Sequence, residues 1–426
     1  MQLSEKIELP CGLVLPNRLA KAAMAESMAK DHTPGKEFVS AYGEWADGGW
    51  GMIITGNVIV NEAFHGSPGD VELSVSREQS PEEKAQWKNW GAVCQRSGTP
   101  TVIQLCHPGR QSPYGAGSSG LFQKTVAPSA VKLNLGDSVI ARTAVSLLFG
   151  TPRELTHEEI TGPEGIIAQF VAASKQCYEA GFKGVELHAS HGYLLAQFMS
   201  PMTNLRTDDF GGTATKRVEI VLRIIREVRK QTSPEFCIGI KLNSVDAASS
   251  ESLEEVMEQI RLINEAGVDF AEISGGTYEN PRMMQDPHDA AKVAEKEPKT
   301  KQSTLLREAF FLQFAQEVRA SFPKLVLMVT GGLRTRLGME AALKTGGCDL
   351  IGIARPAAVL PKLPKEIILN ETISDEDASV VLAPIPVPGW IKYVPVKALG
   401  AGLQSKYYAE QIRRMAKGLS PVDTRI

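Results

Sequence analysis

The sequence lacks the charge imbalance and the long apolar runs that mark several large classes of protein. Its 426 residues include 46 Lys and Arg against 49 Asp and Glu, a formal net charge of -3 at pH 7. Such a balance offers no basic excess to attract nucleic acid or an anionic membrane. The longest apolar run, residues 51–60, is far shorter than the roughly 20 residues of a transmembrane helix. We therefore predict neither a nucleic-acid partner nor a membrane partner.

Cysteine is scarce and scattered, which excludes the common cysteine-based metal centres. The six cysteines are Cys11, Cys94, Cys106, Cys177, Cys237 and Cys348. No two of them form a C-x-x-C pair, so a zinc ribbon or an iron–sulfur cluster lacks its usual ligands. The first residues also lack the apolar stretch of a secretory signal. We expect free thiols in a reducing compartment, with the cytoplasm as the location.

Short apolar runs that alternate with amphipathic stretches organise the chain. The eight strand candidates are residues 19–24, 51–60, 101–107, 184–190, 237–243, 270–276, 325–332 and 349–355. Each is continuously apolar, as expected of a buried parallel strand. Helical periodicity lies between them, for example at 156–181, 215–230, 251–267 and 305–321. Eight such pairs favour an α/β fold of the closed (β/α)8 TIM-barrel type. The alternative, a doubly wound open sheet, usually has fewer strands and a glycine-rich first turn.

The segments outside the barrel pattern predict two additions to it. Residues 5–18 are expected to form a hairpin that caps the amino-terminal mouth of the barrel. We assign residues 1–365 to the barrel domain and residues 366–426 to a helical extension. This extension would pack on the barrel or on a partner subunit, which leaves a homo-oligomer possible.

Two long segments are too long for simple turns. Residues 111–153 and 277–303 are expected to shape access of substrate, because long loops at this end of a barrel commonly do so. Residues 115–120 within the first match G-x-G-x-x-G. No strand enters this motif and no helix follows it, so we do not interpret it as a dinucleotide site.

The endings of the last two predicted strands are typical of a phosphate site. Gly331 and Gly332 follow the seventh strand, and Ala354 and Arg355 follow the eighth. Paired glycines let backbone N–H groups approach an anion, and a guanidinium can bind phosphate oxygens in a bidentate manner. Barrels of this kind often bind phosphate at this position. The alternative is a tight turn beside a surface charge.

Lys241 and Gln104 stand inside predicted barrel strands. A cation inside a barrel is costly unless a negative group answers it, and a reduced flavin carries negative charge at N1 beside its O2 carbonyl. Gln104 has both donors and an acceptor, which suits the O2/N3 edge of such a ring. Gln104 alone is equally well explained as a satisfied core amide.

Two histidines and a tyrosine follow the fourth predicted strand in the segment GVELHASHGY, residues 184–193. His188 and His191 can donate hydrogen bonds to one carbonyl or nitro oxygen, and Tyr193 can act as a general acid. A structural role for all three is one alternative. A metal site completed by His107 is another, but no further ligand stands at a convincing spacing, and we predict no metal.

Several segments together resemble the old yellow enzyme (NADH:flavin oxidoreductase) family. They are residues 16–24, 104–110, 180–201 and 204–212 and the endings of the seventh and eighth strands. The resemblance extends from about residue 5 to about residue 365.

This resemblance implies an FMN-dependent ene-reductase. NADPH or NADH would supply a hydride that passes from flavin N5 to the C=C bond of an α,β-unsaturated carbonyl or a related activated alkene. Along the FMN it implies Ala23, Met24, Gly56, Gln104, Lys241, Gly332, Ala354 and Arg355. His188 and His191 would hold the substrate oxygen, Tyr193 would donate the proton, and Tyr278 is a weaker candidate for lining the substrate pocket.

The sequence departs from the family pattern at two positions. Ala25 stands where many members carry Thr or Cys, so a contact with the flavin O4 region is absent and we expect an altered flavin potential. Lys241 stands where Arg is commoner, which keeps the charge and loses the planar fork. Two other functions stay open: a Schiff-base lyase or aldolase that uses Lys241, and an FMN- or ligand-binding accessory protein with little turnover.

Overall fold

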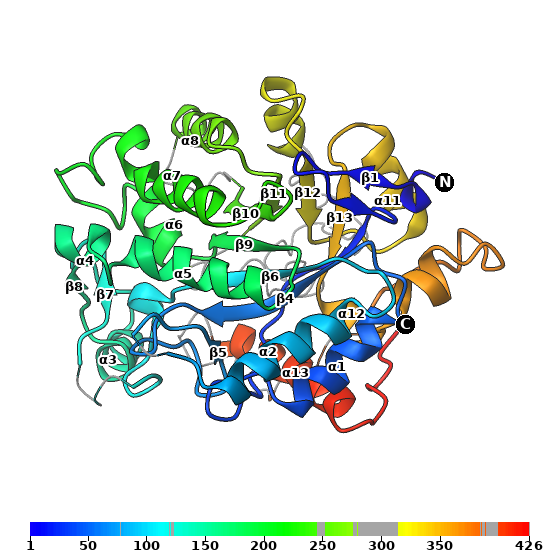
Figure 1. Cartoon of the computed structure of the whole chain (residues 1–426), viewed down its shortest axis with the longest axis horizontal. Helices are drawn as coiled ribbons and strands as arrows, with labels where there is room; N and C mark the ends of the chain where they lie inside the picture. Colours follow the sequence, from blue (N-terminus) through cyan, green and yellow to red (C-terminus); the bar gives the residue numbers. More distant parts are fainter. Residues whose placement is uncertain are drawn as a thin grey trace.

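Eight parallel strands close into a barrel, which confirms the predicted fold and excludes the open sheet (Figure 1). The computed structural model describes residues 1–426 except 77, 119, 121–122, 245–251, 276–278, 280–313, 384, 386–387, 389–398 and 426. The barrel strands are β3 (Leu19–Lys21), β4 (Met52–Ile59), β6 (Thr101–Cys106), β9 (Gly184–Ala189), β10 (Cys237–Asn243), β11 (Phe270–Ser274), β12 (Leu327–Thr330) and β13 (Leu350–Ile353). Closure is made by β3, which pairs in parallel with both β13 and β4. A short strand, β5 (Val71–Glu72), pairs in parallel with the carboxyl end of β4.

The strands form where the apolar runs predicted them because both of their faces are covered. All six residues of β6 and all six of β9 are buried. The register of the central strands matters for the chemistry, since it places Lys241 of β10 opposite His188 of β9 on one side and opposite Glu272 of β11 on the other.

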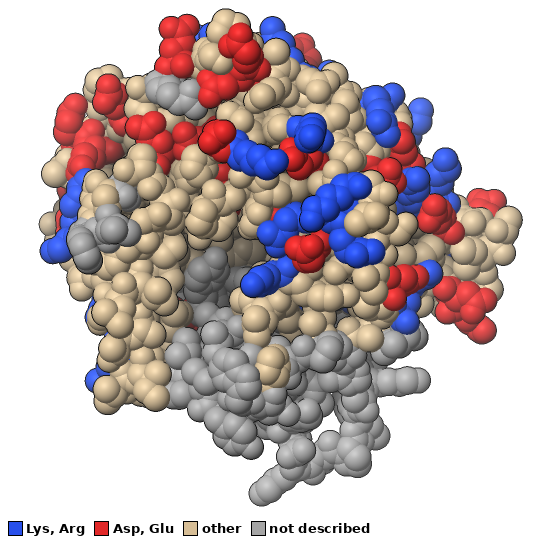
Figure 2. Space-filling view, turned by 90° about the horizontal axis from the view of Figure 1, so that it is seen from below, with Lys and Arg blue, Asp and Glu red and all other residues tan. Residues whose placement is uncertain are grey.

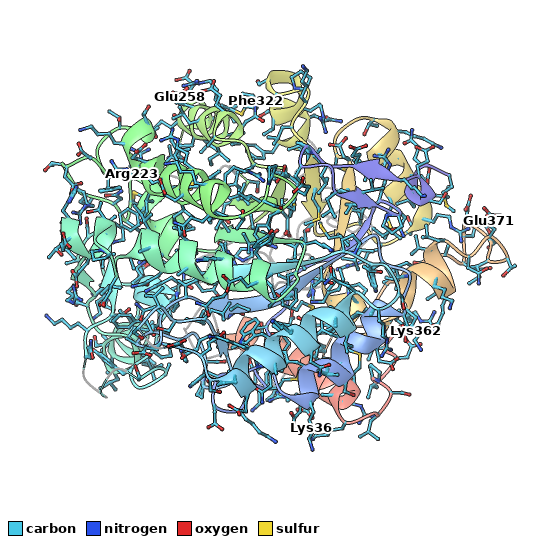
Figure 3. All side chains as sticks on the ribbon, in the orientation of Figure 1. Lys36, Arg223, Glu258, Phe322, Lys362 and Glu371 are labelled. Atoms are coloured by element: carbon cyan, nitrogen blue, oxygen red, sulfur yellow. The ribbon has the colours of Figure 1, made fainter. Side chains whose placement is uncertain are left out.

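Helices surround the barrel. They are α1 (Lys36–Ala46), α2 (Pro81–Cys94), α4 (His157–Thr161), α5 (Ile166–Glu179), α6 (Leu194–Met199), α7 (Ala214–Gln231), α8 (Leu253–Glu265), α11 (Arg336–Lys344) and α12 (Arg355–Val359). Figure 3 shows Arg223 of α7 and Glu258 of α8 on the outer side of this ring. The stretch predicted as one helix over 156–181 is two helices, because Gly162, Pro163 and Gly165 interrupt it between α4 and α5. In the prediction for 305–321, residues 305–313 lie outside the described residues and 314–321 are helical.

The predicted hairpin caps the amino-terminal mouth of the barrel. Strands β1 (Ile7–Glu8) and β2 (Val14–Leu15) pair antiparallel. Leu9 and Leu15 are 2% and 0% exposed, and they belong to the same apolar cluster as Met52 and Phe270 of the barrel strands. Burial of these two leucines therefore anchors the hairpin to the barrel.

The carboxyl-terminal helix packs against the barrel helices. Helix α13 (Leu399–Ala416) lies within the helical extension predicted over 366–426, and Figure 1 shows it beside α1. The hydroxyl of Ser40 on α1 donates to the carbonyl of Met415 at 3.2 Å. The Nη1 of Arg355 on α12 donates to Oε1 of Gln404 at 3.2 Å. Arg355, which is predicted to bind phosphate, is thus hydrogen-bonded to the carboxyl-terminal helix.

The long segment 111–153 carries elements that the sequence did not predict. After the single turn η2 (Gly109–Gln111), it contains the parallel pair β7 (Val126–Ala127) and β8 (Arg153–Glu154) and the helix α3 (Val139–Leu148). Lys and Arg lie interspersed with Asp and Glu on the face shown in Figure 2, which is hollowed near its centre. Among the described helices, none has the length and apolar character needed to cross a membrane.

Candidate functional site

The structure places the predicted site residues at or near the carboxyl ends of the barrel strands. Gly56 lies in β4, Gln104 in β6, His188 in β9 and Lys241 in β10. Other predicted residues lie within three positions of a strand end: Ala23 and Met24 after β3, Gly331 and Gly332 after β12, and Ala354 and Arg355 after β13. Because all strands of the barrel run parallel, their carboxyl ends share one rim. Tyr278, the weaker candidate, lies outside the described residues.

Three aromatic rings gather at the end of β9. The ring centroids of His188 and His191 are 5.1 Å apart, and those of His188 and Tyr193 are 4.6 Å apart, both in edge-to-face geometry. Tyr193 is the residue directly before α6. The segment predicted from the sequence therefore does bring its three functional groups together.

His191 is fixed in place by groups that the sequence analysis missed. Its φ of 58° lies in the left-handed region, which is uncommon for a residue other than glycine. The backbone N–H of His191 donates to Oδ1 of Asn243 at 3.1 Å, and its Nε2 lies 3.1 Å from Oγ of Ser274. Asn243 and Ser274 end the next two strands, and polar residues at strand ends were the signal that could have found them.

Both imidazoles are neutral. Burial lowers the pKa of His188 well below its usual range, with His191 and Lys241 adding to the effect, and burial followed by Lys241 does the same for His191. The backbone N–H of Ser190 points at Nδ1 of His188 at 3.4 Å. A nitrogen that accepts an N–H carries no proton itself, so Nε2 of His188 bears the proton and is a hydrogen-bond donor.

The interior cation Lys241 already has a partner in the protein. Its ammonium forms a buried ion pair with Glu272 of β11. Beside this pair, Nε2 of Gln104 donates to Oε2 of Glu186 on β9 at 2.6 Å. Lys241 and Gln104 were predicted from the sequence as site residues, whereas Glu186 and Glu272 were not. The sequence did contain a signal for these acids, because each glutamate interrupts a mainly apolar strand.

A second buried polar cluster surrounds Gly56. Its backbone N–H donates to Oε1 of Glu26 at 2.9 Å and lies 3.0 Å from the hydroxyl of Tyr42. A side chain at position 56 would meet Glu26 and the carbonyl of Met24 at under 2.5 Å. Only glycine therefore lets these segments approach. Burial lowers the pKa of nearby Lys21 to about 8.

The rim is open where a phosphorylated ring cofactor is expected. Ala23, Met24, Gly331, Gly332, Ala354 and Arg355 are partly exposed, and Ala25 is exposed, although the strands leading to them are buried. Gly331 and Gly332 have φ values of 122° and 82°, a conformation that side chains disfavour and that leaves their backbone approachable. Among the described residues, Lys241 uses one N–H on Glu272 and Gln104 uses one N–H on Glu186, which leaves further donors and the Gln104 carbonyl oxygen for a ligand. The residues present therefore fit the expected FMN.

The structure gives no third ligand to the histidine pair. Within the described ranges, the two groups of three side chains close enough to hold an ion are Cys11, Cys237 and Asp269, and His32, His65 and Glu72. Neither includes His188, His191 or His107. The described residues therefore supply no set of three metal ligands that includes this pair.

Glu279 of the segment 277–303 contacts both Arg110, in the turn after β6, and the segment 111–153. The Nη2 of Arg110 lies 2.6 Å from Oε2 of Glu279, and Oε1 of Glu279 accepts the backbone N–H of Asn134 at 2.7 Å. Arg110 also donates to the carbonyl of Lys132 at 3.1 Å. Residues 132–134 and Glu279 are thus tied together beside the end of β6.

A TIM barrel with a donor-rich rim of this kind is a common architecture of cofactor-dependent enzymes. The sequence profile of the NADH:flavin oxidoreductase / NADH oxidase family matches residues 11–372. The chain belongs to this family, and it is an oxidoreductase that uses FMN and a reduced nicotinamide.

Two fungal flavin oxidoreductases are similar to nearly the whole of this chain. The chain is 44% identical over 422 residues to the NADH-dependent flavin oxidoreductase iccE of Talaromyces variabilis, covering 98% of this chain and 99% of that one. It is 42% identical over 428 residues to iliE of Neonectria sp. (strain DH2), covering 97% of this chain but only 55% of that protein. The chain thus spans about half the length of the Neonectria relative.

Solved structures share the fold at low sequence identity. Morphinone reductase in complex with tetrahydroNAD superposes with a TM-score of 0.67 at 23% identity, over 88% of this chain and 93% of that one. A complex of 2-naphthoyl-CoA reductase gives 0.72 at 22% identity, over 89% of this chain and 53% of that one. These similarities support the barrel architecture.

Proposed function

We propose that the protein is an FMN-dependent ene-reductase that reduces an activated alkene at the expense of NADH. The observation that carries the proposal is the group formed by His188, His191 and Tyr193 at the end of β9. NADH is favoured as the donor because the relatives at 41% to 44% identity are named NADH-dependent. When bound, FMN supplies two-electron hydride chemistry.

The two histidines bind and polarise the substrate oxygen. Nε2–H of His188 is a donor. Nε2 of His191 lies 3.1 Å from Oγ of Ser274; we assign the Ser274 hydroxyl as the donor in this pair, which leaves Nδ1–H of His191 as the second donor. Both rings are neutral, so they stabilise developing negative charge on a carbonyl or nitro oxygen through hydrogen bonds rather than by full protonation. Tyr193 donates the proton to the α-carbon of the alkene.

At the other side of the site, chain residues hold the cofactor. Gln104 and Lys241 bind the pyrimidine edge of FMN, while Ala23, Met24 and Gly56 lie along its ring. Gly331, Gly332, Ala354 and Arg355 bind its phosphate. The open rim and the spare donors described above support these assignments.

The alternative functions are less well supported. A Schiff-base lyase needs a neutral, nucleophilic lysine, whereas Lys241 is paired with the Glu272 carboxylate. An accessory protein that binds FMN without turnover would not need two neutral imidazoles and a phenol facing one another.

An anaerobic two-step spectroscopic experiment tests the proposed function. NADH should bleach the yellow colour of the purified holoenzyme, and a simple enone should restore it; NADPH should bleach it more slowly. A colour that NADH leaves unchanged contradicts the oxidoreductase role. If oxygen reoxidises the bleached enzyme but no activated alkene does so, the ene-reductase role is contradicted.

The exposed Ala25 should be a determinant of the flavin potential. In Ala25→Thr, the new hydroxyl can donate a hydrogen bond to the flavin O4 region, and one such bond contributes about 0.5–1.5 kcal/mol. We therefore expect the two-electron potential to rise by about 10–30 mV and the reductive rate to change. Spectroelectrochemical titration measures the potential, and Ala25→Val is the control of similar size without a hydroxyl. Equal potentials in all three proteins contradict the inference.

We also infer a cytoplasmic location. All six cysteines are free, and five of them are buried. Free thiols are typical of proteins in a reducing compartment. Fractionation of the producing cells tests the location.

A further inference from the structure

Four polar side chains from four consecutive strands form one buried layer inside the barrel. Gln104 contacts Glu186, and Lys241 contacts Glu272. Their exposed fractions are 3% for Gln104, 0% for Glu186, 4% for Lys241 and 0% for Glu272. The two halves of the layer meet at the carboxyl groups of Glu186 and Glu272, which lie near enough for each to shift the pKa of the other. Two buried acids in contact require an account of their charge.

One oxygen on each acid lacks a hydrogen bond of normal geometry when both are ionised. Oε2 of Glu186 accepts from Gln104, and Oε1 of Glu272 accepts from Lys241. The remaining oxygens, Oε1 of Glu186 and Oε2 of Glu272, are in no hydrogen bond of normal geometry among the described residues. The hydroxyl of Thr330 interacts with the carboxyl group of Glu272, whereas Oε1 of Glu186 has no such neighbour in the described part of the chain. Carboxylate oxygens only accept, so two ionised groups would repel each other, whereas a single shared proton satisfies both oxygens at once.

The position of Lys241 decides which acid carries the proton. Its ammonium is paired with Glu272, so Glu272 is the better site for the negative charge. Burial and the neighbouring Glu272 raise the pKa of Glu186 well above its usual range. Burial would also raise the pKa of Glu272, but Lys241, together with hydrogen bonding by Glu186 and by the hydroxyl of Thr330, holds it below the usual range.

We propose that Glu186 is a protonated carboxylic acid that donates its hydrogen bond to Glu272, which makes the cluster of Lys241, Glu272 and Glu186 neutral as a whole. The proposal deepens the proposed function and rests on the FMN position given there. Glu186 is then a positioning residue: it fixes Glu272 against Lys241 and adds no negative charge beneath the pyrimidine edge. Ionised Glu186 would give the cluster one net negative charge and disfavour the reduced cofactor.

Other titratable groups near the layer have defined charges. The positive charge of Lys241 helps to lower the pKa values of His188 and His191, which are neutral. Lys21, which also senses Lys241, has its pKa lowered by burial to about 8. Near pH 7, Lys21 is therefore mainly charged and the two histidines are neutral. Changes of potential measured at this pH report on the charge of the carboxyl pair and not on these three groups.

The variant Glu186→Gln tests the charge of Glu186, because glutamine has the shape and hydrogen-bond donor of the protonated acid. The midpoint potential of the bound flavin should change little. At a fixed solution potential, the ratio of reduced to oxidised flavin should change by less than twofold. A rise of tenfold or more, about 30 mV for a two-electron couple, would show that a negative charge had been removed and would overturn the proposal.

A second pair of variants shows that the flavin senses charge at this layer. The double variant Glu186→Gln with Glu272→Gln leaves the charge of Lys241 uncompensated. The potential should therefore rise, and the ratio of reduced to oxidised flavin at a fixed solution potential should increase at least tenfold. If that protein does not retain FMN, Glu186→Gln with Lys241→Gln should lower the potential instead. No response in either would place FMN elsewhere, which contradicts the proposed function and the tuning role together.

Infrared spectroscopy tests the protonation state independently of where FMN lies. The wild-type protein should show the C=O band of a protonated carboxyl that is missing in Glu186→Gln. Glu26 and Asp70, whose pKa values burial also raises, contribute equally to both spectra and cancel in the difference. A difference spectrum that instead shows loss of a carboxylate band would overturn the assignment.

Discussion

Replacing His188 and His191 together by alanine is expected to slow alkene reduction by about a thousandfold or more. Removal of one preorganised donor at a developing oxyanion typically costs about 2.7–4 kcal/mol, and two donors on one oxygen are not strictly additive. FMN should stay bound, because its proposed contacts lie on other strands. Stopped-flow measurement of flavin reoxidation by an enone gives the rate, and retained absorbance of the purified variant shows the cofactor.

Binding of a phenol-type ligand separates a binding defect from misfolding. The double variant should lose the absorbance change that such a ligand causes in the wild-type flavin, because the phenolate oxygen loses both donors. His157→Ala removes an exposed histidine from α4 and should leave both ligand binding and turnover as in the wild type. Unchanged enone reduction in the double variant contradicts the assignment of the substrate oxygen to this pair.

The charge state of the pair also fixes the pH dependence. Both histidines have pKa values well below the usual range, because burial disfavours the cation. A group with a lowered pKa of this kind is neutral above the folded-state value and becomes charged only as the pH falls through it. The rate of reoxidation should therefore show no inflection from these histidines near neutral pH. A histidine inflection there that disappears in the double variant contradicts the neutral assignment.

The barrel and the positions of the site residues could be predicted from the sequence for one physical reason. Parallel strands buried on both faces give continuous apolar runs, and their carboxyl ends must share a rim. His188, Lys241 and Arg355 could thus be placed on one face before any coordinates were considered. Where a glycine and proline pair interrupts a periodic stretch, as at Gly162 and Pro163, the periodicity alone predicted one helix and the structure has two.

The partners of the site residues depend on register, which the sequence does not specify. Glu272 answers Lys241 because β10 and β11 pair with these two residues opposite each other. From the sequence, only the expected flavin was available as a counter-charge. Helix α3 escaped prediction for a different reason: Val139 and Leu147 are 79% and 72% exposed, so its apolar residues do not mark a buried face.

Tyr193→Phe is expected to slow enone reduction by about 10²–10⁴-fold, the usual contribution of a positioned general acid. Phenylalanine keeps the ring that lies 4.6 Å from His188 and removes only the hydroxyl, so binding of the substrate should change little. The loss should appear in the rate of flavin reoxidation by the enone, whereas flavin reduction by NADH should proceed as in the wild type.

A quinone substrate provides the matched control for this variant. Hydride addition to a quinone gives an oxyanion that the two histidines stabilise, and no proton at carbon is needed. Tyr193→Phe should therefore reduce a quinone at nearly the wild-type rate while failing with the enone. Equal losses with both substrates would mean that Tyr193 supports the site structurally, and equal wild-type rates with both would assign the α-carbon proton to another donor. Only a loss confined to the enone identifies the phenol as the acid, because the two substrates differ in the carbon-bound proton and share the oxygen contacts.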